Sequence, residues 1–118
     1  MPITSTIERL RSEKKEHLQK FGDYAKKDAK LFVNNASYEC LRMIPALQKR
    51  VIKCSDGVFL NEIMEDEEVE AFFKEVFDSY PEVAETDHDG RLEEDGKVFV
   101  EAWLDEVCSL WSDISAKL

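Results

Sequence analysis

The stretch that most constrains the fold runs from Val69 to Tyr80, where apolar residues recur at i, i+3, i+4, i+7, i+8 and i+11. This spacing predicts an amphipathic α-helix whose apolar face lies in the core. Burial of its phenylalanines and valines contributes on the order of 10 kcal/mol before conformational entropy is counted. Asp66 is placed to cap the helix, and Pro81 is placed to end it. The apolar face consists of Val69, Phe72, Phe73, Val76, Phe77 and Tyr80.

The first half of the chain has the same helical spacing, with several candidate interruptions. Ser5 and Glu8 have capping-box spacing, so we expect the first helix to begin there. Gly22-Asp23 combines a C-cap residue with an N-cap residue, and we favour a break or bend at that point. Asn34-Asn35 is a second candidate interruption. Pro45 either kinks the following helix or opens a new one.

The second half begins after a turn predicted at Ser55-Asp56-Gly57. A short apolar patch at 58–64 predicts one helical turn or a buried crossing segment. A last amphipathic helix is expected to begin near Lys97 with Asp95 as its cap, and the one candidate hairpin surrounds residues 94–96. Its apolar face comprises Val98, Phe99, Ala102, Trp103, Val107, Cys108, Trp111, Ile114 and Leu118. We therefore predict an all-α fold: a single-domain bundle of four to five helices over residues 1–118, with a long acidic loop before the C-terminal helix.

Charge is distributed unevenly along the chain. The net charge is −10, but residues 1–54 carry +6 and residues 55–118 carry −16. The excess of acid argues against direct binding to nucleic acid or to an anionic membrane, and it favours a basic partner. With 43% hydrophobic residues, a 118-residue chain can build a core, so disorder of the whole chain is not expected.

Cysteine usage and segment lengths indicate the class of protein. The chain has three cysteines without CxxC spacing, no apolar run at its start, and no stretch long enough to span a bilayer. We expect a soluble, cytoplasmic protein with reduced thiols. Each cysteine falls on an apolar helical face, and the sequence has no nucleophile elbow, phosphate-binding glycine loop or zinc-ligand spacing. An enzyme is therefore not expected, nor is any cofactor other than the calcium considered below.

The loop before the last helix resembles an EF-hand calcium loop. With Gly90 at the sixth position, carboxylates or a carbonyl stand at positions one, three, five, seven and nine. These candidate metal ligands are Glu85, Asp87, Asp89, Arg91 through its carbonyl, and Glu93. Position twelve, where a bidentate glutamate is usual, holds Gly96. The alternative is a solvated turn formed by Asp87-His88-Asp89-Gly90, residue types that tolerate turn geometry.

The acidic side chains of the second half form the other candidate site. Most of them lie off the apolar face of the 69–80 helix, where they would present a negative surface to a basic partner. The proposed partner-binding residues are Glu65, Glu67, Glu68, Glu70, Glu75, Asp78, Glu94 and Asp95. Our first hypothesis is a non-enzymatic protein-binding module with a regulatory or inhibitory role. Its alternative is a calcium-binding module that uses residues 85–96. Solubility alone and formation of a homodimer between oppositely charged halves are the remaining explanations of the charge.

Overall fold

A computed structural model of the chain describes residues 3–52 and 57–118. Within these ranges the protein is an all-α bundle, as predicted, and its β pairing is limited to two isolated bridges. The helices are α1 (Ile3–Asn35), α2 (Tyr38–Ile52), α3 (Leu60–Ile63), α4 (Glu67–Ser79), the short 3₁₀ helix η1 (Pro81–Ala84) and α5 (Glu94–Ala116). No described helix has the length and apolar character needed to cross a membrane.

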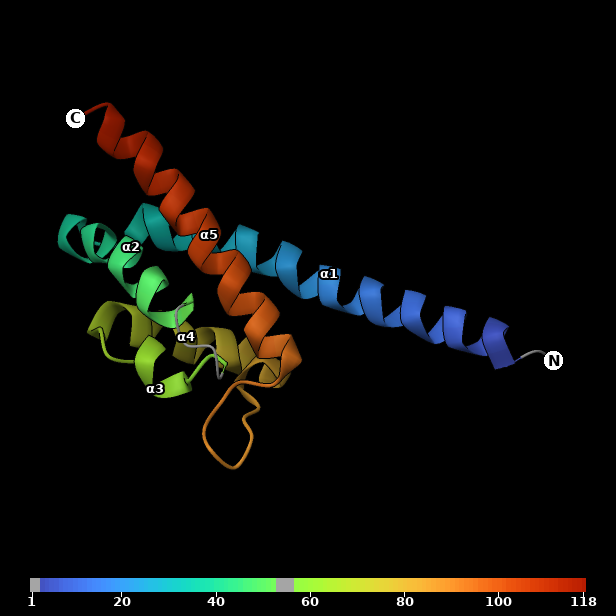
Figure 1. Cartoon of the computed structure of the whole chain (residues 1–118). Helices are drawn as coiled ribbons and strands as arrows, with labels where there is room; N and C mark the ends of the chain where they lie inside the picture. The colour runs from blue at the N-terminus through green and yellow to red at the C-terminus, as the bar shows by residue number, and fades with distance from the viewer. Residues whose placement is uncertain (1–2, 53–56) are drawn as a thin grey trace.

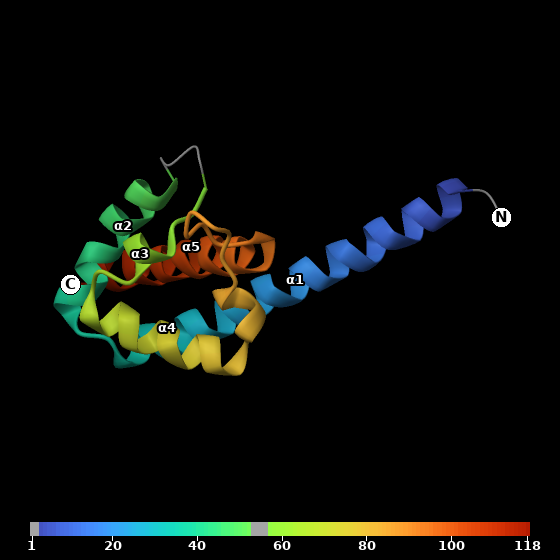
Figure 2. The same ribbon diagram turned by 90° about the horizontal axis from the view of Figure 1, so that it is seen from below.

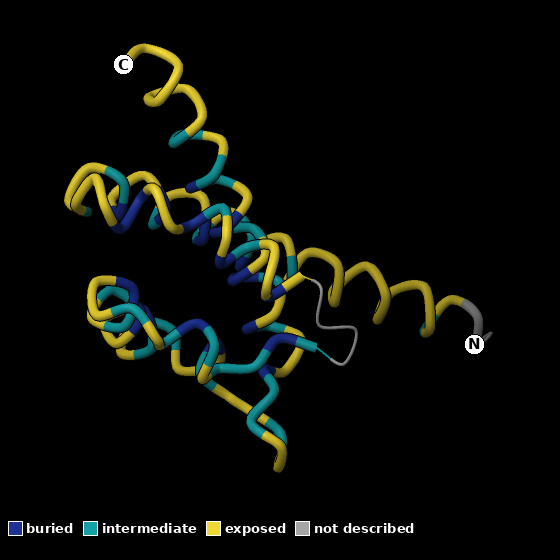
Figure 3. Tube along the Cα trace, turned by 60° about the vertical axis from the view of Figure 1, so that its left-hand side comes forward, coloured by how far each residue is buried: buried dark blue, intermediate teal, exposed yellow. Residues whose placement is uncertain are grey.

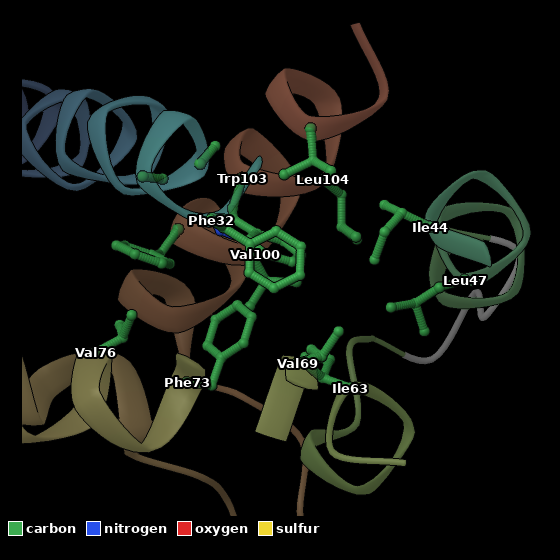
Figure 4. Packing of buried hydrophobic residues seen from close by; sticks show 14 of the residues in the cluster. Phe32, Ile44, Leu47, Ile63, Val69, Phe73, Val76, Val100, Trp103 and Leu104 are labelled. Atoms are coloured by element: carbon green, nitrogen blue, oxygen red, sulfur yellow. The ribbon is translucent and has the colours of Figure 1, made fainter. Parts of the chain in front are cut away.

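The middle of the bundle is α5, which crosses α1 and packs against α2 (Figure 1). Trp103 of α5 is completely buried, and its ring centroid lies 4.9 Å from those of both Phe32 in α1 and Phe73 in α4. Ile44 of α2 and Ile63 of α3 line the other side of this core (Figure 4). One aromatic cluster therefore joins helices that are distant in sequence.

The helix predicted from the 69–80 spacing is confirmed as α4. Asp66 caps it by accepting hydrogen bonds from the amides of Glu68 and Val69, which would otherwise lack partners. Val69, Phe73 and Val76 are buried, while the other three predicted core residues are partly buried and pack against the same core. Pro81 follows the C-cap residue Tyr80 and begins η1, as expected for a residue that cannot continue the α-helix.

The break or bend predicted at Gly22-Asp23 is wrong, because α1 is continuous through both residues. Phe21 and Ala25, on either side of Gly22, are buried in the core. Burial on both sides outweighs the cost of about 1 kcal/mol that a glycine adds to a helix interior. Helix α1 ends instead at Asn35, the second residue of the Asn34-Asn35 pair, whose side-chain amide donates to the Leu31 carbonyl at 2.8 Å. Pro45 lies inside α2 and does not open a new helix.

The last helix begins at Glu94, three residues before the predicted start, and its N-cap residue is Glu93. Asp95 and Gly96 belong to its first turn, so Asp95 is not the cap and residues 94–96 do not form a hairpin. The antiparallel bridges occur earlier, between Thr86 and Leu92 and between Phe59 and Arg91. Of the two structures predicted for the 58–64 patch, a helical turn or a buried crossing segment, the helical turn is present as α3. In the predicted 55–57 turn, Ser55 and Asp56 lie outside the described residues.

The N-terminal part of α1 extends well beyond the rest of the bundle (Figure 2). The molecule measures 60 Å along its longest axis and 33 and 27 Å along the others. Residues of this extension are mostly exposed, whereas the C-terminal half of the same helix contributes Phe21, Ala25, Ala29 and Phe32 to the core (Figure 3). Two contacts mark the transition: an ion pair of Lys14 with Glu94 at 3.0 Å and a hydrogen bond between the His17 ring and Asp95 at 3.2 Å.

Candidate functional site

The loop before α5 is closed by hydrogen bonds from its own backbone. Asp87 Oδ1 accepts from the amides of Asp89 at 2.9 Å and Arg91 at 3.0 Å, and the Asp87 amide donates to the Arg91 carbonyl at 2.8 Å. These bonds, first among them the one from the Arg91 amide, lower the pKa of Asp87. Gly90 completes the turn with φ of 85°, a conformation that favours glycine. The predicted calcium loop is therefore a tight Asx turn.

The side chain of Arg91 supplies a cation within this loop. Its guanidinium group pairs with Asp89 at 2.5 Å and with Asp87 at 3.4 Å. It also lies over the ring of Phe59, 5.7 Å from the centroid. The carbonyl that a calcium ion would use at position seven already accepts the Asp87 amide. The loop thus neutralises part of its own charge.

The five predicted metal ligands do not converge. Asp87 and Asp89 face Arg91, whereas Glu85 and Glu93 line a different, open hollow together with Glu94 and Asp95. Gly96, at the position where a bidentate glutamate is usual, is buried against η1. A Cβ added there would lie 2.4 Å from the Val83 carbonyl oxygen, so this position has no room for a side chain. The packing of Gly96 against η1 therefore excludes the glutamate that the EF-hand pattern has at position twelve.

A different trio of potential ligands occurs where the N-termini of α2 and α4 meet. The ligand atoms of Cys40, Asp66 and Glu68 all lie within 4.8 Å of one another. Each residue, however, has a structural partner: Cys40 Sγ donates to Asp66, and Glu68 accepts from the backbone amide and hydroxyl of Ser37. Burial, reinforced by the two carboxylates, raises the pKa of Cys40 to about 12. The cluster therefore holds two helix ends together around a protonated thiol.

The predicted partner-binding carboxylates fall into two groups. Five of the eight have partners within the protein. Three of these five form ion pairs: Glu65 with Arg50, Glu70 with Lys74, and Glu94 with Lys14. Asp95 is hydrogen-bonded to the ring of His17. Glu68 is the fifth, because it holds Ser37 at the start of α2. The eight predicted carboxylates therefore do not form one continuous surface of unpaired negative charge.

The other three carboxylates, Glu67, Glu75 and Asp78, make no hydrogen bond or ion pair with the described part of the chain. With Ala71 they fall at i, i+4, i+8 and i+11 of α4, which places them along one side of the helix. We call Glu67, Ala71, Glu75 and Asp78 the acidic stripe. All three carboxylates are exposed, so their charges face solvent.

The acidic stripe borders a groove between α1 and α4. This α1–α4 groove has a volume of about 430 Å³ and is lined mainly by apolar atoms. Phe32 and Phe72, whose ring centroids are 5.2 Å apart, contribute its floor, and Leu31 stands at its edge with 52% of its surface exposed. The lining residues are Leu31, Phe32, Asn35, Ala36, Glu68, Ala71, Phe72 and Glu75.

A second groove lies between α2 and the α3–α4 segment and has a volume of about 460 Å³. Ile44, Leu47 and Ile63 contribute apolar surface to it, and the ion pair between Arg50 and Glu65 at 3.0 Å joins residues on its two sides. Its charged residues have both signs, so its electrostatics favour no particular partner. The α1–α4 groove differs because its only charged lining residues, Glu68 and Glu75, are acidic.

Sequence periodicity did not reveal the α1–α4 groove. Leu31 lies off the apolar face defined by Ala25, Ala29 and Phe32, and this displaced leucine is the one available sequence signal for the groove.

Comparisons with known proteins assign the chain to no family: no protein-family model matches the chain, and neither a curated protein nor a solved structure matches it.

Proposed function

We propose that this protein is a non-enzymatic binding module that docks a basic, amphipathic segment of a partner protein in the α1–α4 groove, with a regulatory or inhibitory outcome. The observation that carries the proposal is the position of Leu31. This half-exposed leucine lies at the edge of an apolar groove whose opposite edge bears Glu75. A groove with an apolar floor and an acidic edge is complementary to a helix with an apolar face flanked by lysine or arginine.

Electrostatic attraction and burial of apolar surface contribute to binding at different steps. The acidic stripe attracts a basic segment and orients it during encounter. The groove then removes apolar surface of the segment from water, which contributes about 25 cal/mol for each Å² buried. Charge alone gives weak, salt-sensitive attraction, so the apolar floor is needed for a defined complex.

The proposed site is narrower than the acidic surface expected from sequence. Glu65, Glu70, Glu94 and Asp95 have partners inside the protein, so binding another molecule through them requires breaking an existing ion pair or, for Asp95, the hydrogen bond with His17. Glu68 holds Ser37 and is part of the fold. Of the eight predicted carboxylates, this leaves Glu67, Glu75 and Asp78 as the three that a partner can bind without breaking a contact inside the protein.

The test is affinity capture from cell extract with the protein and two double-substituted forms. Glu67→Lys/Glu75→Lys reverses charge at the groove and leaves Glu68 intact. Glu101→Lys/Glu106→Lys makes the same change on α5 and is the matched control, because neither residue lines the groove. Leu31→Glu tests the apolar component separately, because it removes an apolar side chain from the groove edge while making that edge more acidic.

We expect capture of a basic protein that both Glu67→Lys/Glu75→Lys and Leu31→Glu abolish, and that the α5 control preserves. Capture should also weaken between 0.1 M and 1 M salt, as the Debye length falls from about 10 Å to about 3 Å. A captured partner that is indifferent to salt, or one lost equally with the α5 control, would show that the groove is not its site.

A further inference from the structure

The α1 side of the α1–α4 groove continues one helical turn beyond the residues that line it. The four lining residues of α1 are Leu31, Phe32, Asn35 and Ala36. Asp28 precedes Leu31 by three residues and Phe32 by four, so helical spacing places it on the same face of α1, one turn nearer the N-terminus. Asp28 therefore lies at one end of the groove.

Helix α4 runs antiparallel to α1 along this face. Two aromatic pairs join the segments: Phe32 with Phe72 at 5.2 Å between ring centroids, and Tyr24 with Tyr80 at 4.8 Å. Residue numbers therefore rise along α1 while those of their partners fall. Asp28 lies midway between the two contacts on α1, and Glu75 lies beside the corresponding midpoint on α4. The two carboxylates thus belong to the same end of the groove, one on each helix.

Asp28 is only partly exposed, and its side chain forms no hydrogen bond or ion pair with the described part of the chain. Burial raises the pKa of its carboxyl, and nearby Lys27 lowers it without forming an ion pair. The charge of Asp28 also contributes, after burial, to the raised pKa of Tyr80, which indicates that the carboxylate lies near the end of α4. A partly buried carboxylate without a partner is stabilised by pairing with a cation.

The opposite end of the groove has polar groups that are already bonded. The Asn35 side chain donates to the Leu31 carbonyl, and Glu68 accepts from the amide and hydroxyl of Ser37. Neither carboxylate at the first end has such a bond within the described ranges. The groove therefore has an apolar middle and available negative charge at one end, so it distinguishes the two ends of a ligand.

We propose that Asp28 and Glu75 form the cation-binding end of the α1–α4 groove and receive one arginine or lysine of the docked segment. That basic residue stands one helical turn beyond the apolar residues that contact Leu31 and Phe72, in line with them. Helical positions one turn apart are separated by about 5 Å along the axis, which matches the spacing of Asp28 from Leu31 and Phe32. The inference rests on the proposed function of the groove and specifies the segment that the groove recognises.

The experiment uses two synthetic helical peptides of identical composition with neutral ends. Both carry a row of leucines at helical spacing on a background of alanine and glutamine. In the in-line peptide, a single arginine stands one turn beyond the last leucine of the row. In the displaced peptide, the same arginine lies on the opposite face. Titration of each peptide into the isotope-labelled full chain gives its dissociation constant from the amide shifts of the groove.

Asp28→Asn keeps the size of the side chain and removes its charge. This change should weaken the in-line peptide by about fivefold or more, because a charge-assisted hydrogen bond is lost, and should leave the displaced peptide within about twofold. Asp23→Asn is the matched control, since Asp23 is an exposed aspartate of the same helix that helical spacing places away from the groove. The control should leave the affinities of both peptides unchanged.

A double-mutant cycle tests whether the two groups pair directly. The arginine of the in-line peptide is replaced by citrulline, whose neutral side chain has nearly the same shape. If arginine and Asp28 pair, Asp28→Asn has little further effect on the citrulline peptide, so the two changes together weaken binding no more than either one alone. Circular dichroism of each variant verifies that the helices are retained.

Equal affinities of the in-line and displaced peptides would overturn the inference, as would an effect of Asp28→Asn no larger than that of Asp23→Asn. Either result leaves the proposed function standing if Leu31→Glu still abolishes binding of the peptides. If neither peptide shifts the amides of the groove, the proposed function and the inference both fail. The two failures are therefore distinguishable.

Discussion

Gly96 in the first turn of α5 lies directly against the backbone of Val83 in η1. A Cβ atom at position 96 would come within 2.4 Å of the Val83 carbonyl oxygen and 3.2 Å of the Leu92 side chain. Real Cβ atoms are essentially never found so close to an oxygen, so one of the two segments would have to move. This contact sets how η1 and the 85–93 loop sit on α5.

The first prediction concerns this contact. Gly96→Ala should lower the free energy of unfolding by about 1–3 kcal/mol through overpacking, despite the better helix propensity of alanine. Gly22→Ala is the matched control, because a Cβ at Gly22 in the interior of α1 meets nothing within 4 Å. That change should stabilise the protein by about 0.5–1 kcal/mol. Urea denaturation measures the free energy of unfolding of both variants. If Gly96→Ala stabilises the protein as Gly22→Ala does, the close contact between Gly96 and Val83 is refuted.

The second prediction concerns calcium. Additions up to millimolar calcium should leave the amide shifts of residues 85–93 unchanged, because Arg91 already pairs with Asp87 and Asp89 and position 96 cannot supply a glutamate. Calorimetry provides a second readout. Micromolar affinity that disappears with Asp87→Asn/Asp89→Asn would establish the calcium module instead.

The third prediction concerns the thiol of Cys40. Burial and the nearby Asp66 and Glu68 raise its pKa from 9.0 to about 12, so the thiolate fraction at pH 8 falls by about a thousandfold. Alkylation of Cys40 in the native protein should be correspondingly slow and should become fast in denaturant, as peptide mass spectrometry can follow. Native alkylation at the rate of an unfolded cysteine would contradict the buried cluster.

The same raised pKa has a consequence for stability. A thiol whose pKa is higher in the folded state favours folding while it is protonated, so its contribution is complete below about pH 9 and is lost as pH rises toward 12. Stability measured between about pH 8 and pH 11 should therefore fall more steeply for the parent than for Cys40→Ala. Identical slopes would indicate that Cys40 titrates alike in both states.

The fourth prediction concerns Asp87, whose pKa is lowered chiefly by the amide hydrogen bond from Arg91. A carboxyl with a lowered pKa stabilises the folded state above its unfolded pKa of about 3.8, and this contribution is lost as pH falls through the folded value. Asp87→Asn should therefore flatten the acid side of the stability profile. An acid side that Asp87→Asn leaves unchanged would count against the Asx turn.

Much of the fold followed from local sequence patterns. The spacing from Val69 to Tyr80, the cap at Asp66 and the stop at Pro81 were sufficient to place α4, because its apolar face, cap and terminator agree. Predictions failed where packing overrode a local signal. Gly22 lies within a helix whose neighbouring turns are buried, and Gly96 lies inside α5 because the backbone of η1 requires a residue without a side chain there.

The candidate site was predicted less well, for a physical reason. Charge counts show how many carboxylates a segment has, but the partner of each one depends on tertiary contacts. Glu94 and Asp95 meet Lys14 and His17, about 80 residues earlier in the chain. The α1–α4 groove likewise depends on how two separate helices pack, so the local sequence patterns did not predict it.

The most direct test of the central claim is a map of binding on the protein itself. A synthetic amphipathic helix of leucine and lysine, titrated into isotope-labelled protein, provides a defined basic ligand. We predict that amide shifts change at Leu31, Asn35, Ala71 and Glu75, and that Glu67→Lys/Glu75→Lys removes these changes. Shifts confined to the second groove, between α2 and the α3–α4 segment, or to the 85–93 loop, with no shifts in the α1–α4 groove, would contradict the account.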